Sequence, residues 1–337
     1  MNLNFLKNKA ILITGATGSF GRNLTFYLLK HSKAKKIIIF SRDELKQHDL
    51  KNKINSKIVR YFIGDIRDYD RLNFALKGVD IVIHAAALKH IDISEYNPFE
   101  FIKTNILGCQ NIIQACFENK VKNVLALSTD KASSPINLYG ATKLISDKLF
   151  VSANNYRGSN EIKFSVVRYG NVFGSRGSVI PLFLNQLKTK KLTVTNPEMT
   201  RFSITIDDAV KFVIESLDNM LGGEIFVPKL KSYYVKDIVK AISKKTTKIK
   251  IIGVRPGEKT HEEIISKNDA INTVENKNSY VILPNSEFNS LNVSNYLKLK
   301  KNSIKVLNNF CYNSSDNKFF LSQEEIKKLI LKVKIKL

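Results

Sequence analysis

The amino-terminal end of the chain combines a short apolar run with a glycine-rich turn. Residues 9–14 (KAILIT) form a continuous apolar segment, which is typical of a strand buried on both faces. The segment leads into a G-x-x-G-x-x-G turn at residues 15–21 and then into a helical pattern through Leu24 and Leu28. Glycines at such a turn let the backbone approach a pyrophosphate at the helix N-terminus. The pattern therefore predicts a dinucleotide-binding unit. Because the spacing is one residue longer than the usual fingerprint, an ordinary glycine-rich turn is the alternative.

The end of the second predicted strand, residues 36–40, bears on the choice of cofactor. Ser41, Arg42 and Asp43 follow the strand directly, and Lys46 comes one turn later. An acid at this position suits the free ribose hydroxyl of NAD, whereas cations suit the additional phosphate of NADP. The sequence favours NADP, and Asp43 keeps NAD open as the alternative.

Strands and helices alternate up to about residue 170, which predicts an α/β fold with a Rossmann-like, doubly wound parallel sheet. Two further strands, 59–63 and 80–84, end before Asp65 and Ala85. The predicted NADP-binding domain covers residues 1–170, with a return segment at about 203–228. Residues 171–202 and 229–337 are less regular and are predicted to form a smaller α/β substrate-binding lobe with a C-terminal extension.

Reactive side chains follow another apolar strand near the middle of the chain. Thr129, Asp130 and Lys131 come directly after that strand. Tyr139 and Lys143 lie four apart on a predicted helix, so they share one face. A lysine beside a tyrosine lowers the pKa of the phenol and makes the tyrosinate a usable base. The combination predicts a catalytic site, although a lone Tyr-x-x-x-Lys pattern is common by chance.

Composition narrows the other possibilities. The net charge of +24 invites a nucleic-acid interpretation, but the lysines are spread along the whole chain without a nucleic-acid-binding motif. Cys109, Cys116 and Cys311 have no metal or redox spacing, which fits a reducing cytoplasm. The histidines share no metal-ligand spacing, and no stretch is long enough to span a bilayer. We expect a soluble, cytoplasmic protein with no metal, nucleic-acid or membrane partner.

A series of longer motifs covers nearly the whole chain in one order. They are TGATGSFG (14–21), FSRDELKQ (40–47), GDIRD (64–68), HAAALKH (84–90), EYNPFE, STDKA, PINLYGATK, VVRYGNVFGSRGSVIP (166–181), MTRF, GGEIFVPK and RPGEK (255–259). In these motifs the chain resembles the extended short-chain dehydrogenase/reductase superfamily. Within it, the chain is similar to the inverting UDP-N-acetylglucosamine 4,6-dehydratases of pseudaminic acid biosynthesis. Tyr139 stands where longer, membrane-tethered relatives carry methionine, which favours the short soluble branch.

The resemblance implies a hydro-lyase that holds NADP and acts on UDP-N-acetylglucosamine. Tyr139 would accept the proton of the 4-hydroxyl while Lys143 holds the tyrosinate and hydride passes from carbon 4 to NADP. Lys131 would then remove the carbon-5 proton and Asp130 would protonate the departing 6-hydroxyl. The hydride would return to carbon 6, and reprotonation of carbon 5 from the opposite face would give UDP-2-acetamido-2,6-dideoxy-β-L-arabino-hex-4-ulose. Because a base must be neutral, we expect burial beside Lys143 and the nicotinamide to lower the pKa of Lys131.

The remaining expectations concern binding residues, assembly and alternatives. The residues expected to contact NADP are Gly15, Thr17, Gly18, Ser19, Phe20, Gly21, Ser41, Arg42, Asp43, Lys46, Asp65, Ile66, Ala85, Ala86, Thr104, Tyr139, Lys143, Tyr169, Asn171 and Val172. Those expected to contact the substrate are Lys89, Lys131, Asn171, Gly174, Ser175, Arg176, Val179, Thr195, Arg201, Arg255 and Glu258. An internal salt bridge between Arg255 and Glu258 is the alternative for that pair. The resemblance implies a homo-oligomer, either a dimer or a hexamer. A 4-epimerase of the same sugar nucleotide and a non-catalytic NADP-binding protein are the competing functions. The recipient of the final sugar, whether flagellin, capsule or lipopolysaccharide, stays open.

Overall fold

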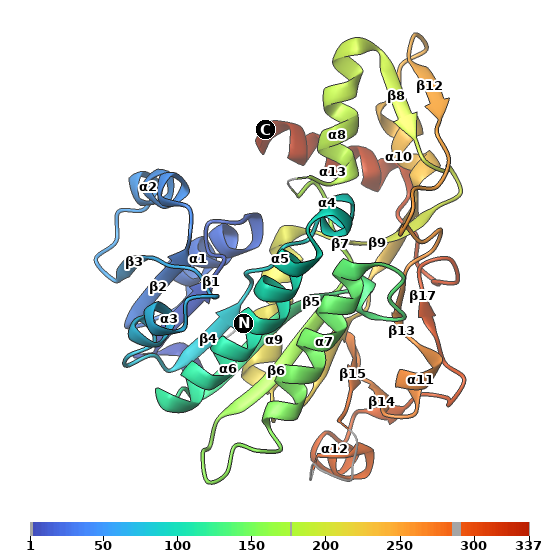
Figure 1. The fold of residues 1–337 in the computed structure, drawn as a ribbon. Helices are drawn as coiled ribbons and strands as arrows, with labels where there is room; N and C mark the ends of the chain where they lie inside the picture. Colours follow the sequence, from blue (N-terminus) through green and yellow to red (C-terminus); the bar gives the residue numbers. More distant parts are fainter. Residues whose placement is uncertain (1–2, 176, 285–290, 337) are drawn as a thin grey trace.

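A large, mostly parallel sheet runs through the centre of the molecule (Figure 1). The structure is a computed structural model that describes residues 3–175, 177–284 and 291–336. The ten strands of the sheet lie in the order β16-β14-β15-β10-β6-β5-β4-β1-β2-β3. The seven strands from β10 to β3 are mutually parallel, as predicted. Their bounds are β1 (Ala10–Thr14), β2 (Lys36–Ser41), β3 (Val59–Ile63), β4 (Ile81–His84), β5 (Asn123–Thr129), β6 (Lys163–Tyr169) and β10 (Ile225–Pro228).

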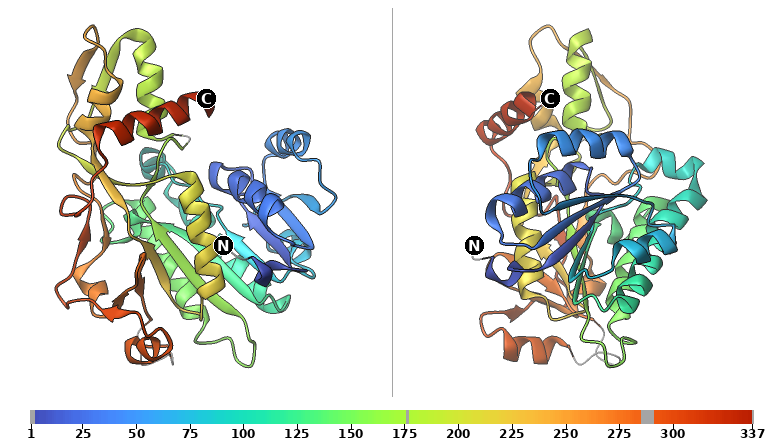
Figure 2. Two further views of the ribbon diagram at one scale, coloured as in Figure 1. Left: turned by 180° about the vertical axis from the view of Figure 1, so that it is seen from behind. Right: turned by 90° about the vertical axis from the view of Figure 1, so that its left-hand side faces the viewer.

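The central strands are buried because helices cover both faces of the sheet. Every residue of β1 and β4 is buried, which explains why their sequences read as continuous apolar runs. Figures 1 and 2 show α3, α5, α6 and α7 on one face and α1 and α9 on the other. The bounds of the helices in this part of the chain are η1 (Asn4–Leu6), α1 (Ser19–His31), α2 (Glu44–Lys53), α3 (Tyr69–Ala75), α4 (Ile91–Tyr96), α5 (Pro98–Ile102), η2 (Lys103–Leu107), α6 (Gly108–Glu118), η3 (Asp130–Ala132), α7 (Leu138–Ala153) and α9 (Ile206–Asn219).

A second, smaller lobe stands at one end of the sheet and has its own hydrophobic core (Figure 1). Ile180, Leu192, Ile238 and Ile330 belong to this core, which brings distant segments of the chain together. A three-stranded sheet, β11-β9-β7, connects the lobe to the main sheet region. The elements of the lobe and of this sheet are β7 (Asn171–Val172), α8 (Val179–Gln186), η4 (Leu187–Thr189), β8 (Lys191–Val194), β9 (Thr200–Ile204), β11 (Lys231–Tyr234), α10 (Val235–Ile242), β12 (Lys248–Ile251) and α13 (Gln323–Lys336).

One part of the predicted substrate lobe lies elsewhere. The segment from about 263 to 313 was assigned to that lobe, but its strands β15, β14 and β16 extend the edge of the main sheet beyond β10. Val274 and Val281 are buried in the main core rather than in the core of the small lobe. The remaining elements of this segment are β13 (Glu263–Ile265), α11 (Lys267–Ala270), β14 (Thr273–Glu275), β15 (Ser279–Ile282), α12 (Val293–Leu299), β16 (Ile304–Lys305) and β17 (Tyr312–Asn313).

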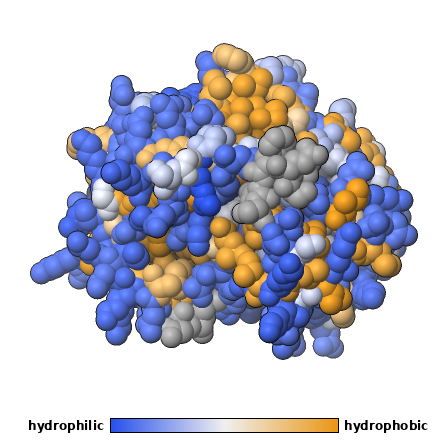
Figure 3. All heavy atoms as spheres, turned by 90° about the horizontal axis from the view of Figure 1, so that it is seen from below, coloured by the Kyte–Doolittle hydropathy of each residue, from blue (hydrophilic) through white to orange (hydrophobic). Residues whose placement is uncertain are grey.

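The surface is mostly polar, as expected for a chain in which 25% of the residues are charged. Seen from below, it is mainly hydrophilic with separate apolar patches (Figure 3). None of the helices in the described ranges is both long enough and apolar enough to cross a membrane.

Candidate active site

The glycine turn after β1 packs so closely against neighbouring backbone that Gly15 and Gly21 leave no room for a Cβ atom. Gly15 has φ +64, and a Cβ there would lie 2.8 Å from the backbone nitrogen of Ala86. A Cβ at Gly21 would lie 2.5 Å from the Cα of Ala16. Both neighbours are backbone atoms, which cannot rotate away as a flexible side chain would. The turn therefore has the close strand–helix contact of a dinucleotide-binding unit.

The N-terminus of α1 has the character of an anion site. Gly18 caps the helix without a side-chain hydrogen bond, and Ser19 and Phe20 are its first two residues. Because a glycine at the cap has no side chain to accept from the first N–H groups of the helix, these groups can bind a phosphate. The Thr17 hydroxyl points elsewhere and donates to the Ser41 hydroxyl at 3.2 Å. These residues fit the pyrophosphate of a dinucleotide.

Charged side chains at the ends of β2 and β3 pair with one another. Arg42 lies 3.6 Å from Asp65, and its side chain is about half exposed at 52%. Lys46 forms an ion pair with Asp43, which also caps α2. The two cations predicted to favour NADP are therefore each next to a carboxylate.

The other predicted cofactor residues line the same edge of the sheet. The backbone N–H groups of Ala85 and Ala86 donate to the Thr14 hydroxyl, which fixes the loop after β4. Ile66 is buried against Gly108, where a Cβ would come within 2.8 Å of it. The Thr104 hydroxyl is buried and has no hydrogen-bond partner among the described residues.

The predicted catalytic residues converge where β5 ends. The Thr129 hydroxyl donates to the Asp130 carboxylate at 2.9 Å. The Lys131 amine lies 3.1 Å from the same Asp130 oxygen and 3.5 Å from the Asn171 amide oxygen. Tyr139 is buried in the first turn of α7, which packs against η3. The structure thus brings an acid, an amine and a phenol to one buried place.

Glu262 is a member of this cluster that the sequence pattern did not reveal. Its carboxylate lies 3.1 Å from the Lys131 amine and 3.6 Å from the guanidinium of Arg201. The side chain is almost completely buried, with 3% exposed. It immediately precedes Glu263 in a charged loop, so its sequence context gives no sign of which of the two glutamates turns inward.

The electrostatics of the cluster correct one prediction. Burial alone would lower the pKa of Lys131, as expected, but the carboxylates of Asp130 and Glu262 outweigh it and raise the pKa above its usual value. The Lys131 amine is therefore an ammonium ion in this arrangement. Burial raises the pKa of Asp130, and Glu262 adds to that effect against the opposing influence of Lys131.

The environment of Tyr139 corrects a second prediction. Burial raises the pKa of Tyr139 to about 12, and the nearby Lys131 ammonium only partly opposes this effect. Lys143 lies on the same helix, and its buried amine donates to the Leu127 carbonyl at 2.8 Å. Tyr169 is also buried, and burial together with Tyr139 raises its pKa.

Part of the predicted substrate side lies close to this cluster. Desolvation lowers the pKa of Lys89, and the charge of Lys131 lowers it further, which places the two amines near each other. Arg201 reaches Glu262, as described above. The loop of residues 255–258 is attached to the catalytic helix, because the Asn137 amide donates to the Gly257 carbonyl at 2.8 Å. Arg255 is 3.9 Å from Glu258 and about half exposed, so the salt bridge considered as an alternative is present.

A cavity of about 380 Å³ joins the two predicted binding regions. Ser19 and Val172, predicted for the cofactor, line it together with Gly174 and Ser175, predicted for the substrate. Arg176 lies outside the described residues. Val179 begins α8, and the Thr195 hydroxyl contacts the Met199 sulfur at 3.3 Å, so these two belong to the small lobe.

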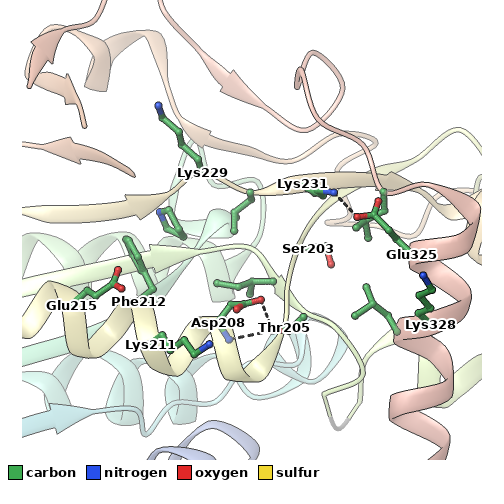
Figure 4. Close-up of a pocket in the computed structure, with 15 residues that line it drawn as sticks. Ser203, Thr205, Asp208, Lys211, Phe212, Glu215, Lys229, Lys231, Glu325 and Lys328 are labelled. Atoms are coloured by element: carbon green, nitrogen blue, oxygen red, sulfur yellow. Dashed lines mark hydrogen bonds and ion pairs between the residues drawn. The ribbon is translucent and has the colours of Figure 1, made fainter. Parts of the chain in front are cut away.

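A second cavity, of about 530 Å³, lies between α9 and α13 (Figure 4). Lys229, Lys231 and Glu325 are among its lining residues, and Lys231 pairs with Glu325 across it. None of the residues predicted for catalysis or binding lines this cavity. Within the described ranges, no group of three or more His, Cys, Asp or Glu side chains is arranged to hold a metal.

The profile of a family described as "Polysaccharide biosynthesis protein" matches residues 11–284. The chain belongs to this family. Two Campylobacter jejuni members, named UDP-N-acetylglucosamine 4,6-dehydratase (inverting), are 51% identical over 96% of this chain and 97% of their own length. A Rickettsia bellii member named UDP-glucose 4-epimerase is 40% identical over 96% of both chains. The resemblance predicted from the motifs is confirmed.

Two solved structures have folds similar to that of this chain. The X-ray structure of Pen from Bacillus thuringiensis matches with a TM-score of 0.89 and 38% identity, covering 98% of this chain and 99% of that one. A dTDP-glucose 4,6-dehydratase from Streptomyces venezuelae, solved with NAD and TYD bound, matches with a TM-score of 0.68 over 74% of this chain and 86% of that one. At 23% identity, the second match shows the shared fold alone. The fold is that of the extended short-chain dehydrogenases/reductases, as predicted.

Proposed function

We propose that the protein is a UDP-N-acetylglucosamine 4,6-dehydratase that inverts carbon 5. The observation that carries the proposal is the contact of 3.1 Å between the Lys131 amine and the Asp130 carboxylate beside Tyr139. Elimination across carbons 5 and 6 needs a base for one carbon and an acid for the oxygen on the other, in addition to the group that serves the 4-hydroxyl. The 51% identity to dehydratases of that name supports the assignment.

NADP is the cofactor that we infer. The glycine turn, the uncapped N-terminus of α1 and the buried, unpartnered hydroxyl of Thr104 fit a dinucleotide. Arg42 and Lys46 would bind its additional phosphate by exchanging their carboxylate partners for it. When bound, NADP would supply reversible oxidation at the sugar.

Tyr139 is the group that we assign to the proton of the 4-hydroxyl. Its high pKa in the described arrangement means that it loses its proton only when further positive charge adjoins it. The nicotinamide ring of bound NADP would add such a charge. Lys143, fixed by the Leu127 carbonyl, would hold the cofactor ribose beside the phenol.

Lys131 and Asp130 are assigned to carbon 5 and to the oxygen on carbon 6. A single proton shift from the Lys131 ammonium to the Asp130 carboxylate, across their 3.1 Å contact, produces a neutral amine and a neutral acid together. The amine would remove the carbon-5 proton and the acid would protonate the leaving hydroxyl. Reprotonation of carbon 5 from the opposite face would then invert it.

The remaining assignments extend from this reaction. We infer that Arg201, Arg255 and Glu258 contact the nucleotide, since an arginine binds phosphate oxygens through paired donors. The product would be the first intermediate of pseudaminic acid biosynthesis. We propose self-association as well, either as a dimer or as a hexamer.

Incubation of the purified protein with UDP-N-acetylglucosamine tests the proposal. Mass spectrometry should show loss of water, and NMR should show a 4-keto-6-deoxy sugar with inverted carbon 5. Lys131→Ala should still bind NADP but form no product, whereas an active Lys131→Ala enzyme would remove Lys131 from the mechanism.

A 4-epimerase is the second candidate, because relatives named UDP-glucose 4-epimerase are 40% identical over 96% of the chain. An epimerase would use Tyr139 but would need no base at carbon 5, so the Lys131–Asp130 pair, in which the acid is buried, argues for elimination. Formation of UDP-N-acetylgalactosamine without loss of water would establish the epimerase instead.

A further inference from the structure

The Lys131 amine lies between two buried carboxylates rather than beside one. Asp130 and Glu262 each place an oxygen 3.1 Å from it. The two acids come from different segments of the chain, since Asp130 follows β5 and Glu262 precedes β13. A buried carboxylate is unfavourable unless charges or hydrogen bonds compensate it. Lys131 and Arg201 supply that compensation and, against the effect of burial, keep the pKa of Glu262 below its usual value.

Each of the two acids also has one buried oxygen with no hydrogen-bond partner among the described residues. These atoms are Oδ2 of Asp130 and Oε2 of Glu262. Buried polar atoms in a folded protein nearly always have partners. Each acid therefore contacts the Lys131 amine through one oxygen and keeps a second oxygen whose hydrogen bonds are not made.

The backbone around Glu262 is fixed to the rest of the site. Its N–H donates to the Ser314 hydroxyl at 2.9 Å, and its carbonyl accepts from the Ser314 N–H at 2.8 Å. Nearby, the Lys259 amine donates to the Ser133 carbonyl at 2.7 Å, directly after η3. The loop that carries Glu262 is therefore held by hydrogen bonds to Ser314 and, through Lys259, to Ser133, and these fix the backbone from which the carboxylate reaches Lys131.

We propose that Glu262 is a positioning residue of the dehydration reaction: it holds the Lys131 amine in line with the sugar and keeps its charge state linked to that of Asp130. The proposal rests on the proposed function. Glu262 does not act on the substrate carbon. It acts through Lys131, which would otherwise turn wholly toward Asp130.

The charge of Glu262 determines the pH range of the pair. The reactive form carries one proton shared by Lys131 and Asp130, so it is lost when a second proton is gained or when that proton is released. Glu262 favours protonation of both groups, and its negative charge therefore moves both limbs of a pH–rate profile to higher pH. The other titratable groups facing the cluster are Tyr139 of α7, Lys89 after β4, Arg201 of β9, Tyr233 of β11 and Lys259.

Three variants of the full-length protein test the proposal in the UDP-N-acetylglucosamine assay. Glu262→Gln removes the charge and keeps the shape, and it should lower kcat about tenfold or more with little change in KM. Both limbs of its pH profile should move to lower pH by ~1 unit or more. Glu262→Asp keeps the charge, so its limbs should stay in place while the shorter side chain lowers kcat.

Glu263→Gln is the matched control. Glu263 is adjacent in the chain, but its carboxylate accepts from the Ser134 hydroxyl at 2.6 Å and has no ion pair with Lys131. Both limbs of the pH–rate profile of Glu263→Gln should coincide with those of the wild type. A Glu262→Gln enzyme with the limbs and kcat of the wild type would overturn the proposal. If Glu262→Gln does not fold, a Glu262→Asp enzyme with unchanged kcat would overturn it instead. Absence of dehydration by the wild type would overturn the proposed function itself.

Discussion

Replacing Asp147 with alanine should destabilise the protein far more than removing an exposed acid does. Asp147 lies in α7 and is 1% exposed, and its carboxylate is 3.1 Å from the guanidinium of Arg168, which is 2% exposed. Arg168 in turn donates to the Ile264 carbonyl at 3.1 Å. The pair therefore joins the helix that carries Tyr139 to the strand that follows Glu262.

The size of the effect follows from burial. Breaking a buried pair by removing one partner costs about 3–5 kcal/mol, because the other charge stays buried. For a chain of 337 residues, an unfolding entropy of about 2.1 cal/mol/K per residue turns this loss into a Tm decrease of about 4–7 °C. Arg168 also lies 3.4 Å from Asp269, a quarter-exposed acid that would keep the cost near the lower end.

Thermal unfolding followed by calorimetry measures the effect. Glu161→Ala is the control, because Glu161 pairs with Lys122 at 3.3 Å but is 82% exposed, so its loss should cost under about 1 kcal/mol. The double variant Asp147→Leu/Arg168→Met should lose less than the sum of its single variants, since no unpaired charge is left inside. Equal Tm decreases for Asp147→Ala and Glu161→Ala would refute the reasoning.

Three other outcomes are expected. Gly21→Val should raise the Kd for NADPH at least tenfold in a fluorescence titration, because its Cβ would lie 2.5 Å from the Ala16 backbone; unchanged binding would count against the glycine turn as the cofactor site. Burial, with a smaller effect of Lys143, lowers the pKa of His84 to about 3. The folded state therefore protonates His84 at a lower pH than the unfolded state, in which the pKa of the imidazole is 6.5. The stability contributed by neutral His84 should therefore fall between pH 6.5 and 3, and the pH dependence of Tm should be flatter for His84→Gln. Burial and then Glu263 raise the pKa of the Cys311 thiol to about 12, so a disulfide reagent at pH 8 should label it much more slowly than a free thiol.

The parallel sheet could be predicted because its strands carry their own signal. A strand buried on both faces must be apolar throughout, and residues 9–14, 36–40 and 59–63 match β1, β2 and β3 to within one residue at each end. The candidate catalytic residues could be found for a related reason. Functional groups of such sheets lie at the ends of the strands, as Thr129 ends β5 and Asp130 follows it.

The other edge of the sheet has no such signal. β14 and β16 have the sequences TVE and IK, which are too short to show a period. β14 becomes a strand by pairing with β15, and β16 by pairing with β14. Glu262 was missed for a similar reason. Its partner Lys131 lies on a distant segment of the chain, and spacing along a sequence reveals only pairs within one element.

The charge state of Lys131 shows how a local inference can give the wrong sign. Considered with Lys143 alone, a buried lysine should be neutral, and that reasoning held for the effect of burial. Two acids from different segments reverse the result, so the route to a neutral base must differ. In the proposed mechanism a proton shift to Asp130 would supply it, because burial and Glu262 raise the pKa of that carboxyl. The site would then obtain its base and its acid from the same proton, and the buried carboxylates that make Lys131 cationic at rest would also make the shift possible.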